Sequence, residues 1–258
     1  MAFETYESEP AVSAVRAVSM QVAADRERTA YERFLKRPVD VVASFVLLIV
    51  MAPLAAIVAI GVAITMGRPV IFKQQRLSRG GREFTMYKFR SMRPPASAGE
   101  NDGGPSEFHA APDSPRHTPF GRFIRRVALD ELPQLWNVLK GDMSLIGPRP
   151  EMPEVAEAYD IVDHPRHLVR PGMTGAWQVS EFRDGFVHMH VHIDAAYVGN
   201  LTLRQDLTIA MRTIGVVLGG GGEKIRQDKL EAQKAAEADE EIDLRDDTID
   251  LRPVRVLH

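Results

Sequence analysis

The stretch VALDELPQLWNVLKGDMSLIGPRP, from Val127 to Pro150, decides how the rest of the chain is understood. Two adjacent carboxylates, Asp130 and Glu131, stand just before Pro133 and an apolar run. Pro133 suits the first turn of a helix, and Gly141 is a natural stop for it. Spacings of three and four residues predict one apolar face on this helix, made of Leu132, Leu135, Trp136 and Leu139.

The acid pair is therefore expected at a helix N-terminus, where the helix dipole favours negative charge and lowers the pKa of a carboxylate. Further along, Arg149 is held between Pro148 and Pro150 in a stiff turn. An ionised acid pair with an immobilised arginine could handle phosphate chemistry. The alternative, from these residues alone, is an ordinary acidic first turn followed by a proline-rich loop.

Composition limits the protein classes to consider. The chain has 258 residues, a net charge of −3 and no cysteine. That length allows one or two domains with a sizeable core, and the lack of cysteine excludes disulfides and thiolate metal sites. The overall charge does not indicate a nucleic-acid partner. The N-terminus opens with acidic residues and has no apolar core with a cleavage site, so it is not a secretory signal.

A long apolar run follows the polar N-terminal part. Between Val39 and Met66 the only charged residue is Asp40. Such a run is long enough to cross the hydrocarbon core of a membrane. Pro53 stands near its middle, and basic residues flank both ends, so both ends prefer the cytoplasm. We therefore expect a bent, re-entrant hairpin, although length alone favours a span.

Two strands are expected next, at Val70–Leu77 and Arg82–Met92, joined by a glycine-containing turn. In the second strand, Lys88 and Arg90 fall on the same face, where they could bind a phosphate. The alternative is a basic edge strand that faces anionic lipid headgroups.

The segment between this hairpin and the acid pair divides in two. Arg93–Pro119 is a long loop rich in Pro, Gly, Ser and Ala, and its position before the acid pair is typical of a lid. Residues 120–126 interleave aromatic and aliphatic residues with arginines, which favours a helix at a membrane surface. Later, His188, His190 and His192 alternate at a spacing that can bind metal, but no supporting carboxylates are evident.

These patterns predict a mostly helical α+β protein with four parts. They are a polar N-terminal extension (1–35), a re-entrant membrane helix broken near Pro53 (36–67), a cytoplasmic catalytic domain with amphipathic interfacial helices and a small β-hairpin (68–220), and a charged, partly disordered C-terminal tail (221–258).

Four motifs together resemble one family. KRPVDVV leads into the apolar run and is followed by YKFRSM, LDELPQLWNVLKGDMSLIGPRPE and RPGMTGAWQV. From about Lys36 to Ile214 the chain resembles the bacterial sugar transferases that act on polyprenol phosphate, the monotopic phosphoglycosyl transferases. Larger members of that family carry spanning helices ahead of the catalytic unit, and this chain is similar to a compact form.

The resemblance implies the site residues. The catalytic Asp-Glu dyad of the family falls on Asp130 and Glu131, which would also be the ligands of Mg²⁺. The expected substrate-binding residues are Lys88, Arg90, Pro148, Arg149, Arg170, Gln178 and Arg183. After Gln178 the chain departs from the family pattern, so Arg183 stands only approximately at the position of the expected arginine.

The resemblance also implies the reaction and its place. The protein would transfer a sugar-1-phosphate from a UDP-sugar to polyprenol (undecaprenyl) phosphate among the membrane lipids and release UMP. It would thereby initiate assembly of a glycan, which could be an exopolysaccharide, an O-antigen, a capsule or the glycan of a glycoprotein. The expected location is the cytoplasmic face of the bacterial inner membrane. A homodimer and downstream glycosyltransferases are further expected partners.

The residues permit a two-step mechanism in which Asp130 attacks the β-phosphorus and holds the phosphosugar covalently. One alternative is a single-step transferase without this intermediate. The other is an inactive membrane-anchored scaffold that binds partners through its acidic tail.

Overall fold

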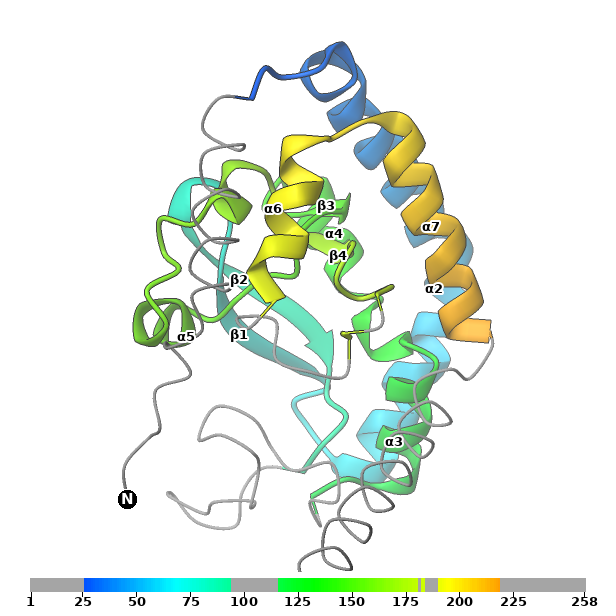
Figure 1. Cartoon of the computed structure of the whole chain (residues 1–258). Coiled ribbons are helices and arrows are strands. Elements are labelled where there is room, and N and C mark those ends of the chain that lie inside the picture. Colours follow the sequence, from blue (N-terminus) through cyan, green and yellow to red (C-terminus); the bar gives the residue numbers. More distant parts are fainter. Residues whose placement is uncertain (1–25, 94–115, 181, 184–189, 219–258) are drawn as a thin grey trace, which may run out of the picture. The chain divides into compact units, whose positions relative to one another are not determined.

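The computed structural model describes residues 26–93, 116–180, 182–183 and 190–218 (Figure 1). The chain divides into two units, Met1–Gly219 and Gly220–His258, and every described residue belongs to the first. The expectations for residues 1–25, the greater part of the predicted lid, His188 and the acidic tail lie outside the described residues.

Helices dominate the first unit (Figure 1). They are the π-helical turn η2 (Tyr31–Leu35), α2 (Lys36–Met66), α3 (Pro119–Arg126), α4 (Gln134–Lys140), α5 (Pro153–Ala158), α6 (Val191–Gly199) and α7 (Leu203–Leu218), with 3₁₀ turns η3 (Arg79–Gly81), η4 (Leu129–Glu131) and η5 (Pro165–Leu168). The strands are β1 (Ile71–Leu77), β2 (Glu83–Phe89), β3 (Ser144–Ile146) and β4 (Gly172–Thr174). The prediction of mixed helix and small sheet is confirmed.

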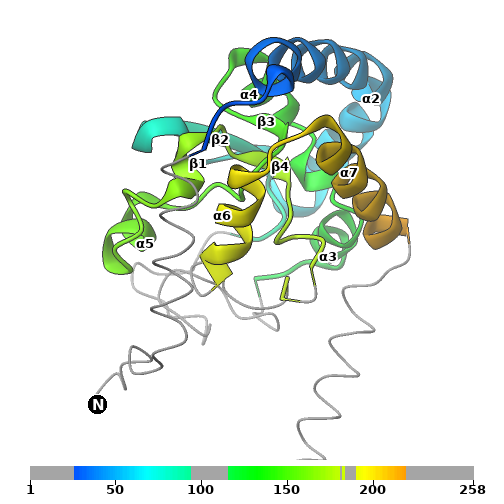
Figure 2. The same cartoon turned by 45° about the horizontal axis from the view of Figure 1, so that its top comes forward.

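The strands form two separate small sheets (Figure 2). β1 and β2 form the predicted antiparallel hairpin, in which Phe72 lies opposite Lys88. The parallel pair of β3 and β4 was not predicted, because three-residue strands carry too little alternation to be recognised. Their close approach requires Gly172, since a Cβ there would lie 2.1 Å from the backbone nitrogen of Gly147.

Helix α4 ends at Gly141 as predicted, where φ is 96°, but its buried face is rotated from the predicted one: Leu135 is buried as expected, together with Gln134, Asn137 and Val138. Trp136, predicted to be in the apolar face, is 54 % exposed, whereas Asn137 is fully buried. The side chain of Asn137 donates to Thr85 O at 2.8 Å and accepts from Tyr87 N at 3.1 Å, so it hydrogen-bonds the free edge of β2. A polar residue that caps a strand edge therefore sets the orientation of α4, which apolar spacing could not reveal.

Helix α2 continues through Pro53 and does not end there. In both views the helix changes direction along its length (Figures 1 and 2). A proline inside a helix removes one backbone hydrogen bond and clashes with the preceding turn, which accounts for a bend at Pro53. Among the described residues, Tyr31–Met66 is the one helical stretch that is long and apolar enough to cross a membrane.

Both halves of α2 contact the same unit. Near its start, Asp40 accepts hydrogen bonds from Ser144 Oγ at 2.8 Å and Leu145 N at 3.2 Å. Lys36 donates to Asp206 Oδ2 of α7 at 2.6 Å. Near its end, α2 contributes to an apolar cluster with β2 and α3, made of Val58, Val62, Phe89 and Ile124. The helix is thus attached to the folded unit on both sides of its bend.

The turn η5 buries a histidine whose charge state affects stability. Burial, and then the nearby Arg166, lower the pKa of His167 to about 4, although a hydrogen bond with the Ile161 backbone acts in the opposite direction. The unfolded chain binds a proton near pH 6.5, whereas the folded protein does not until about pH 4. The stability contributed by neutral His167 is therefore complete above pH 6.5 and is lost as the pH falls towards 4.

We expect His167→Gln to reduce the acid sensitivity of the fold. Between pH 7.5 and pH 5 the wild-type protein should lose about 2 kcal/mol through this residue, and the variant should not. Thermal unfolding of both proteins in detergent at the two pH values measures the difference. An equal shift of the midpoint in both proteins would exclude His167 as the source.

Candidate active site

The acid pair lies in its own turn, η4, between α3 and α4. Ala128 precedes this turn with a φ of 55°, a left-handed conformation that is strained for alanine and often marks a functional site. Pro133 is the residue before α4, so the two acids stand one turn ahead of the predicted position in the helix. Asp130 is 7 % exposed.

The two carboxylates have different electrostatic surroundings. Glu131 Oε1 accepts a hydrogen bond from Lys88 Nζ at 2.9 Å in an ion pair. Burial would raise the pKa of Glu131, but Lys88 and Arg149 outweigh it and hold the pKa below its ordinary value. Burial and the neighbouring Glu131 raise the pKa of Asp130 to about 6, although Lys88 and Arg125 lower it.

The expectation that both acids have lowered pKa values is thus wrong for Asp130. In the described part of the chain, no cation pairs with Asp130 within 4 Å, because Lys88 bonds to the other carboxylate. A buried carboxylate with a pKa of about 6 is still mostly ionised at pH 7. The Asp130 carboxylate is therefore desolvated, and no ion pair with a described residue occupies its oxygen atoms, so they are available for nucleophilic attack.

A small cleft beside the acid pair collects several predicted residues. It is lined by Arg76, Met86, Lys88, Glu131, Gln134, Arg149, Pro150, Gly172 and Met173. Lys88 and Arg149 were predicted from sequence, and the structure brings both to Glu131. Arg76 and Gln134 were missed. The hairpin register, with Arg76 opposite Phe84, places Arg76 beside the predicted phosphate-binding face, but register cannot be read from one sequence.

The other predicted substrate-binding residues lie elsewhere. Arg90 follows β2 and its side chain donates to Arg68 O at 3.4 Å. Arg170 Nε donates to Gly141 O at 2.8 Å, at the end of α4. Gln178 Nε2 donates to Met173 O at 3.3 Å, and the backbone nitrogen of Arg183 donates to Ser180 O at 3.4 Å. None of these four residues lines the cleft, and neither does Pro148, the fifth.

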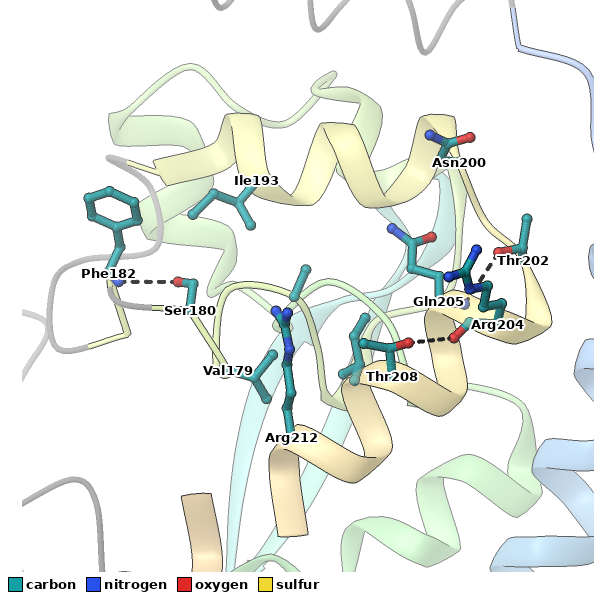
Figure 3. A pocket seen from close by; sticks show the side chains of 12 residues that line it. Val179, Ser180, Phe182, Ile193, Asn200, Thr202, Arg204, Gln205, Thr208 and Arg212 are labelled. Carbon is teal, nitrogen blue, oxygen red and sulfur yellow. Dashed lines mark hydrogen bonds between the residues drawn. The ribbon is translucent and has the colours of Figure 1, made fainter. Parts of the chain in front are cut away.

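A larger groove lies between α6, α7 and the segment after β4 (Figure 3). Its volume is about 720 Å³, and its walls are Ala176, Val179, Ser180, Phe182, Ile193, Asn200, Thr202, Arg204, Gln205, Thr208, Ile209 and Arg212. No carboxylate and no predicted site residue is among them. His190, from the histidine run, stacks on Phe182 of this groove with 4.7 Å between ring centroids.

The acid pair fits a magnesium ion that is shared with a substrate. Among the described residues, no cluster of three or more His, Cys, Asp or Glu residues could hold a metal. Mg²⁺ usually keeps several waters and binds through one or two carboxylates plus substrate phosphates. The unpaired, buried carboxylate of Asp130 beside Glu131 suits that mode of binding.

The chain belongs to the bacterial sugar transferase family, which matches residues 31–220. It is 43 % identical over 205 residues to "Undecaprenyl-phosphate galactose phosphotransferase" of Salmonella typhimurium, covering 74 % of this chain and 42 % of that protein. It is 38 % identical to "UDP-glucose:undecaprenyl-phosphate glucose-1-phosphate transferase" of Xanthomonas campestris pv. campestris, covering 70 % of this chain and 38 % of that protein. These matches span less than half the length of those two relatives.

A shorter relative matches over nearly its full length. "Uncharacterized sugar transferase EpsL" of Bacillus subtilis is 38 % identical over 188 residues, which cover 73 % of this chain and 89 % of that protein. The family assignment confirms the resemblance found in the four sequence motifs. Together with the long apolar helix α2, it indicates association with a membrane.

Proposed function

We propose that this chain is a phosphoglycosyl transferase that moves a sugar-1-phosphate from a UDP-sugar to undecaprenyl phosphate and so begins assembly of a glycan. The observation that carries this proposal is the buried Asp130, which makes no ion pair with a described residue. The neighbouring Glu131 is held ionised by Lys88 and Arg149. The names of the relatives from Salmonella and Xanthomonas describe this class of reaction.

In the proposed first step, a carboxylate oxygen of Asp130 attacks the phosphorus that bears the sugar. An Asp–O–P bond forms, the bond to the bridging oxygen breaks, and UMP leaves with that electron pair. In the second step an oxygen of undecaprenyl phosphate attacks the same phosphorus, and Asp130 leaves as a free carboxylate. No base is needed for either step, because a carboxylate is already ionised at pH 7 and the acceptor is a phosphate.

The obstacle for an anionic nucleophile is repulsion from the diphosphate. Lys88 and Arg149 line the cleft, and their positive charges offset that repulsion. This electrostatic stabilisation is largest in the transition state, where negative charge develops. Asp130 and Glu131 would hold Mg²⁺, which when bound neutralises charge on the phosphate oxygens. The chain's own cations already separate the roles of the two acids, since Lys88 engages Glu131 and leaves Asp130 free.

The proposed membrane topology is re-entrant, with both ends of α2 on the cytoplasmic side. Support comes from the contacts at both halves of α2, since Asp40 and Val62 pack against one folded unit. Large apolar side chains on α2, α3, α4 and α7 are exposed and suit a lipid surface; they include Phe45, Ile49, Ile64, Phe123, Trp136, Leu207 and Met211. Because one folded unit packs against both ends of the helix, we expect both ends to lie on the same side of the bilayer.

Single cysteines can test this topology, because the natural chain has none. We expect Arg28→Cys and Gln75→Cys, on either side of α2, both to react with an impermeant maleimide only when the cytoplasmic side is accessible. Inside-out and right-side-out vesicles supply the two conditions. Labelling of the two positions from opposite sides would establish a span and exclude the re-entrant arrangement.

The reaction is tested by incubating the purified full-length chain with Mg²⁺, undecaprenyl phosphate and a panel of UDP-sugars, with UMP release as the readout. One or a few UDP-sugars should release UMP. Without the lipid acceptor, mass spectrometry should find the phosphosugar on Asp130. Turnover with lipid but no adduct would favour a single-step transferase. No UMP from any UDP-sugar would favour the scaffold, for which the described residues offer no support.

A further inference from the structure

The backbone that carries Arg149 is clamped at four consecutive carbonyl groups. Each carbonyl from residue 148 to 151 accepts a hydrogen bond from a different position in the chain: Pro148 O from Gly172 N at 2.8 Å, Arg149 O from Arg166 Nη2 at 2.7 Å, Pro150 O from Arg76 Nη1 at 3.2 Å, and Glu151 O from Leu77 N at 2.9 Å. Prolines at 148 and 150 also restrict φ. Little freedom remains for this segment.

Arg166, one of these donors, is itself held by buried acids. Its side chain is 1 % exposed, and Nη2 lies 2.8 Å from Asp194 Oδ2, which is fully buried on α6. Nη1 lies 3.8 Å from Glu151 Oε2. Arg76 also lies 3.5 Å from Glu151. Two arginines and two carboxylates thus form one buried quartet next to the Arg149 segment: Arg76, Glu151, Arg166 and Asp194.

Stability alone does not account for such a quartet. Desolvating ionised groups is costly, and well-packed apolar residues of similar size are often as stable as a buried ion pair or more so. A guanidinium, however, presents several donors in a rigid plane and can bond a carbonyl and a carboxylate at once. Arg166 Nη2 donates a hydrogen bond to the carbonyl of Arg149, and the same nitrogen lies within ion-pair distance of Asp194 Oδ2.

The side chain of Arg149 shows what this clamp positions. Its guanidinium lies 5.9 Å from the centroid of the Trp177 ring, and it lines the small cleft together with Lys88 and Glu131. A cation that binds the diphosphate of a substrate must be held in a fixed position, because a misplacement of about 1 Å can lower the reaction rate on the order of a hundredfold.

We propose that Arg166, held by Asp194, is a positioning residue that acts through the backbone of Arg149. Arg166 does not touch the substrate; it fixes the Arg149 carbonyl and thereby aims the Arg149 guanidinium at the phosphate groups. This inference rests on the proposed function, which supplies those phosphates, and it adds Arg166 and Asp194 to the residues on which that function depends.

A double-mutant cycle in the full-length protein tests the coupling, with kcat and KM for UMP release as the readout. Arg166→Met should lower kcat/KM about 10- to 100-fold when Arg149 is present, and less than about threefold in an Arg149→Ala background. A purely structural role would lower activity by the same factor in both backgrounds and would overturn the inference. The pair Arg166→Met/Asp194→Leu removes both charges, so it keeps the fold if Arg166→Met alone does not, and it should show the same dependence on Arg149.

Arg82→Met is the matched control. Arg82 is exposed and pairs with Asp142 at 2.9 Å, and it makes none of the four hydrogen bonds to the Arg149 segment, so activity should stay within about twofold of the wild type. Hydrogen exchange supplies a readout that is independent of turnover. The amides of Leu77 and Gly172, which donate to the clamped segment, should exchange faster in Arg166→Met than in Arg82→Met.

The kinetic cycle and the hydrogen-exchange measurement together separate a failure of the inference from a failure of the proposed function. If the wild-type protein releases no UMP, the proposed function fails, and the exchange rates alone decide whether Arg166 clamps the segment. If UMP is released but the cycle is additive, the function stands and the inference is wrong. Equal exchange of the two amides in both variants would also overturn it.

Discussion

Asp130→Asn is expected to abolish sugar-phosphate transfer, with a loss of at least about a thousandfold in kcat, because it replaces the proposed nucleophile by a neutral amide of the same shape. No phosphosugar adduct should form on the peptide that contains residue 130. UMP release with saturating UDP-sugar, Mg²⁺ and lipid acceptor measures the first effect, and peptide mass spectrometry measures the second.

The same substitution should leave the fold as stable as before or make it more stable. The pKa of Asp130 is about 6 in the folded protein and near 4 when unfolded, so the folded state binds the proton more tightly. Stability from this residue is therefore present below pH 4 and is lost as the pH rises through 6. At pH 7.5 the ionised acid opposes folding by on the order of 2–3 kcal/mol, and asparagine removes that cost.

Asp142→Asn is the control for this prediction. Asp142 is also buried, but it is paired with Lys140 and Arg82, and both cations help to lower its pKa. Loss of the Asp142 charge should therefore lower the free energy of unfolding, while the rate of UMP release should stay within a few-fold of the wild type. If Asp130→Asn retained more than about a tenth of the activity, Asp130 could not be the nucleophile.

Asp194→Ala is expected to lower the free energy of unfolding by about 3–5 kcal/mol, the largest stability effect that we predict from a single side chain. Arg166 would lose its carboxylate at 2.8 Å, and the two buried arginines would be left with Glu151 alone. An uncompensated buried charge is costly because water cannot solvate it. A loss of this size should lower the unfolding midpoint by roughly 6–20 °C for a unit of this length.

An ion pair of the same chemistry with an exposed arginine shows whether burial of the arginine is the cause. Arg82 is 61 % exposed in its ion pair with Asp142, so Arg82→Ala should cost less than about 1 kcal/mol. Thermal or urea unfolding in detergent at pH 7.5 compares the two variants. Midpoints within a degree or two of each other would show that the Arg166–Asp194 pair does not contribute through burial.

Much of the architecture could be predicted from the residues because its signals are local. The apolar run around Pro53 needs no partner to be recognised as a membrane segment, and a two-residue period with a glycine turn is enough for the hairpin of β1 and β2. Gly141 ends α4 by its own backbone freedom. Lys88 and Arg149 were predicted as site residues because both lie in motifs that resemble the family.

Features that depend on contacts between distant segments were missed or misplaced. Trp136 was assigned to the core because the hydrogen bonds of Asn137 with β2 cannot be seen in the spacing of apolar residues. Arg76 enters the cleft only through the register of the hairpin. Arg170 bonds Gly141 O at the end of α4, a contact that the sequence did not reveal, and its phosphate contact stays a prediction.

The sequence by itself determined which residues carry charge and which segment prefers lipid, since both follow from side-chain chemistry and order along the chain. Asp130 and Glu131 are neighbours in the sequence, and nothing local distinguishes them. Only the tertiary structure decided that Lys88 bonds to Glu131, that Asp130 is buried with no ion-pair partner among the described residues, and that Arg166 donates a hydrogen bond to the Arg149 carbonyl. The physical reason is that desolvation and Coulomb energy depend on distance in space, and the partners that set them come from far along the chain.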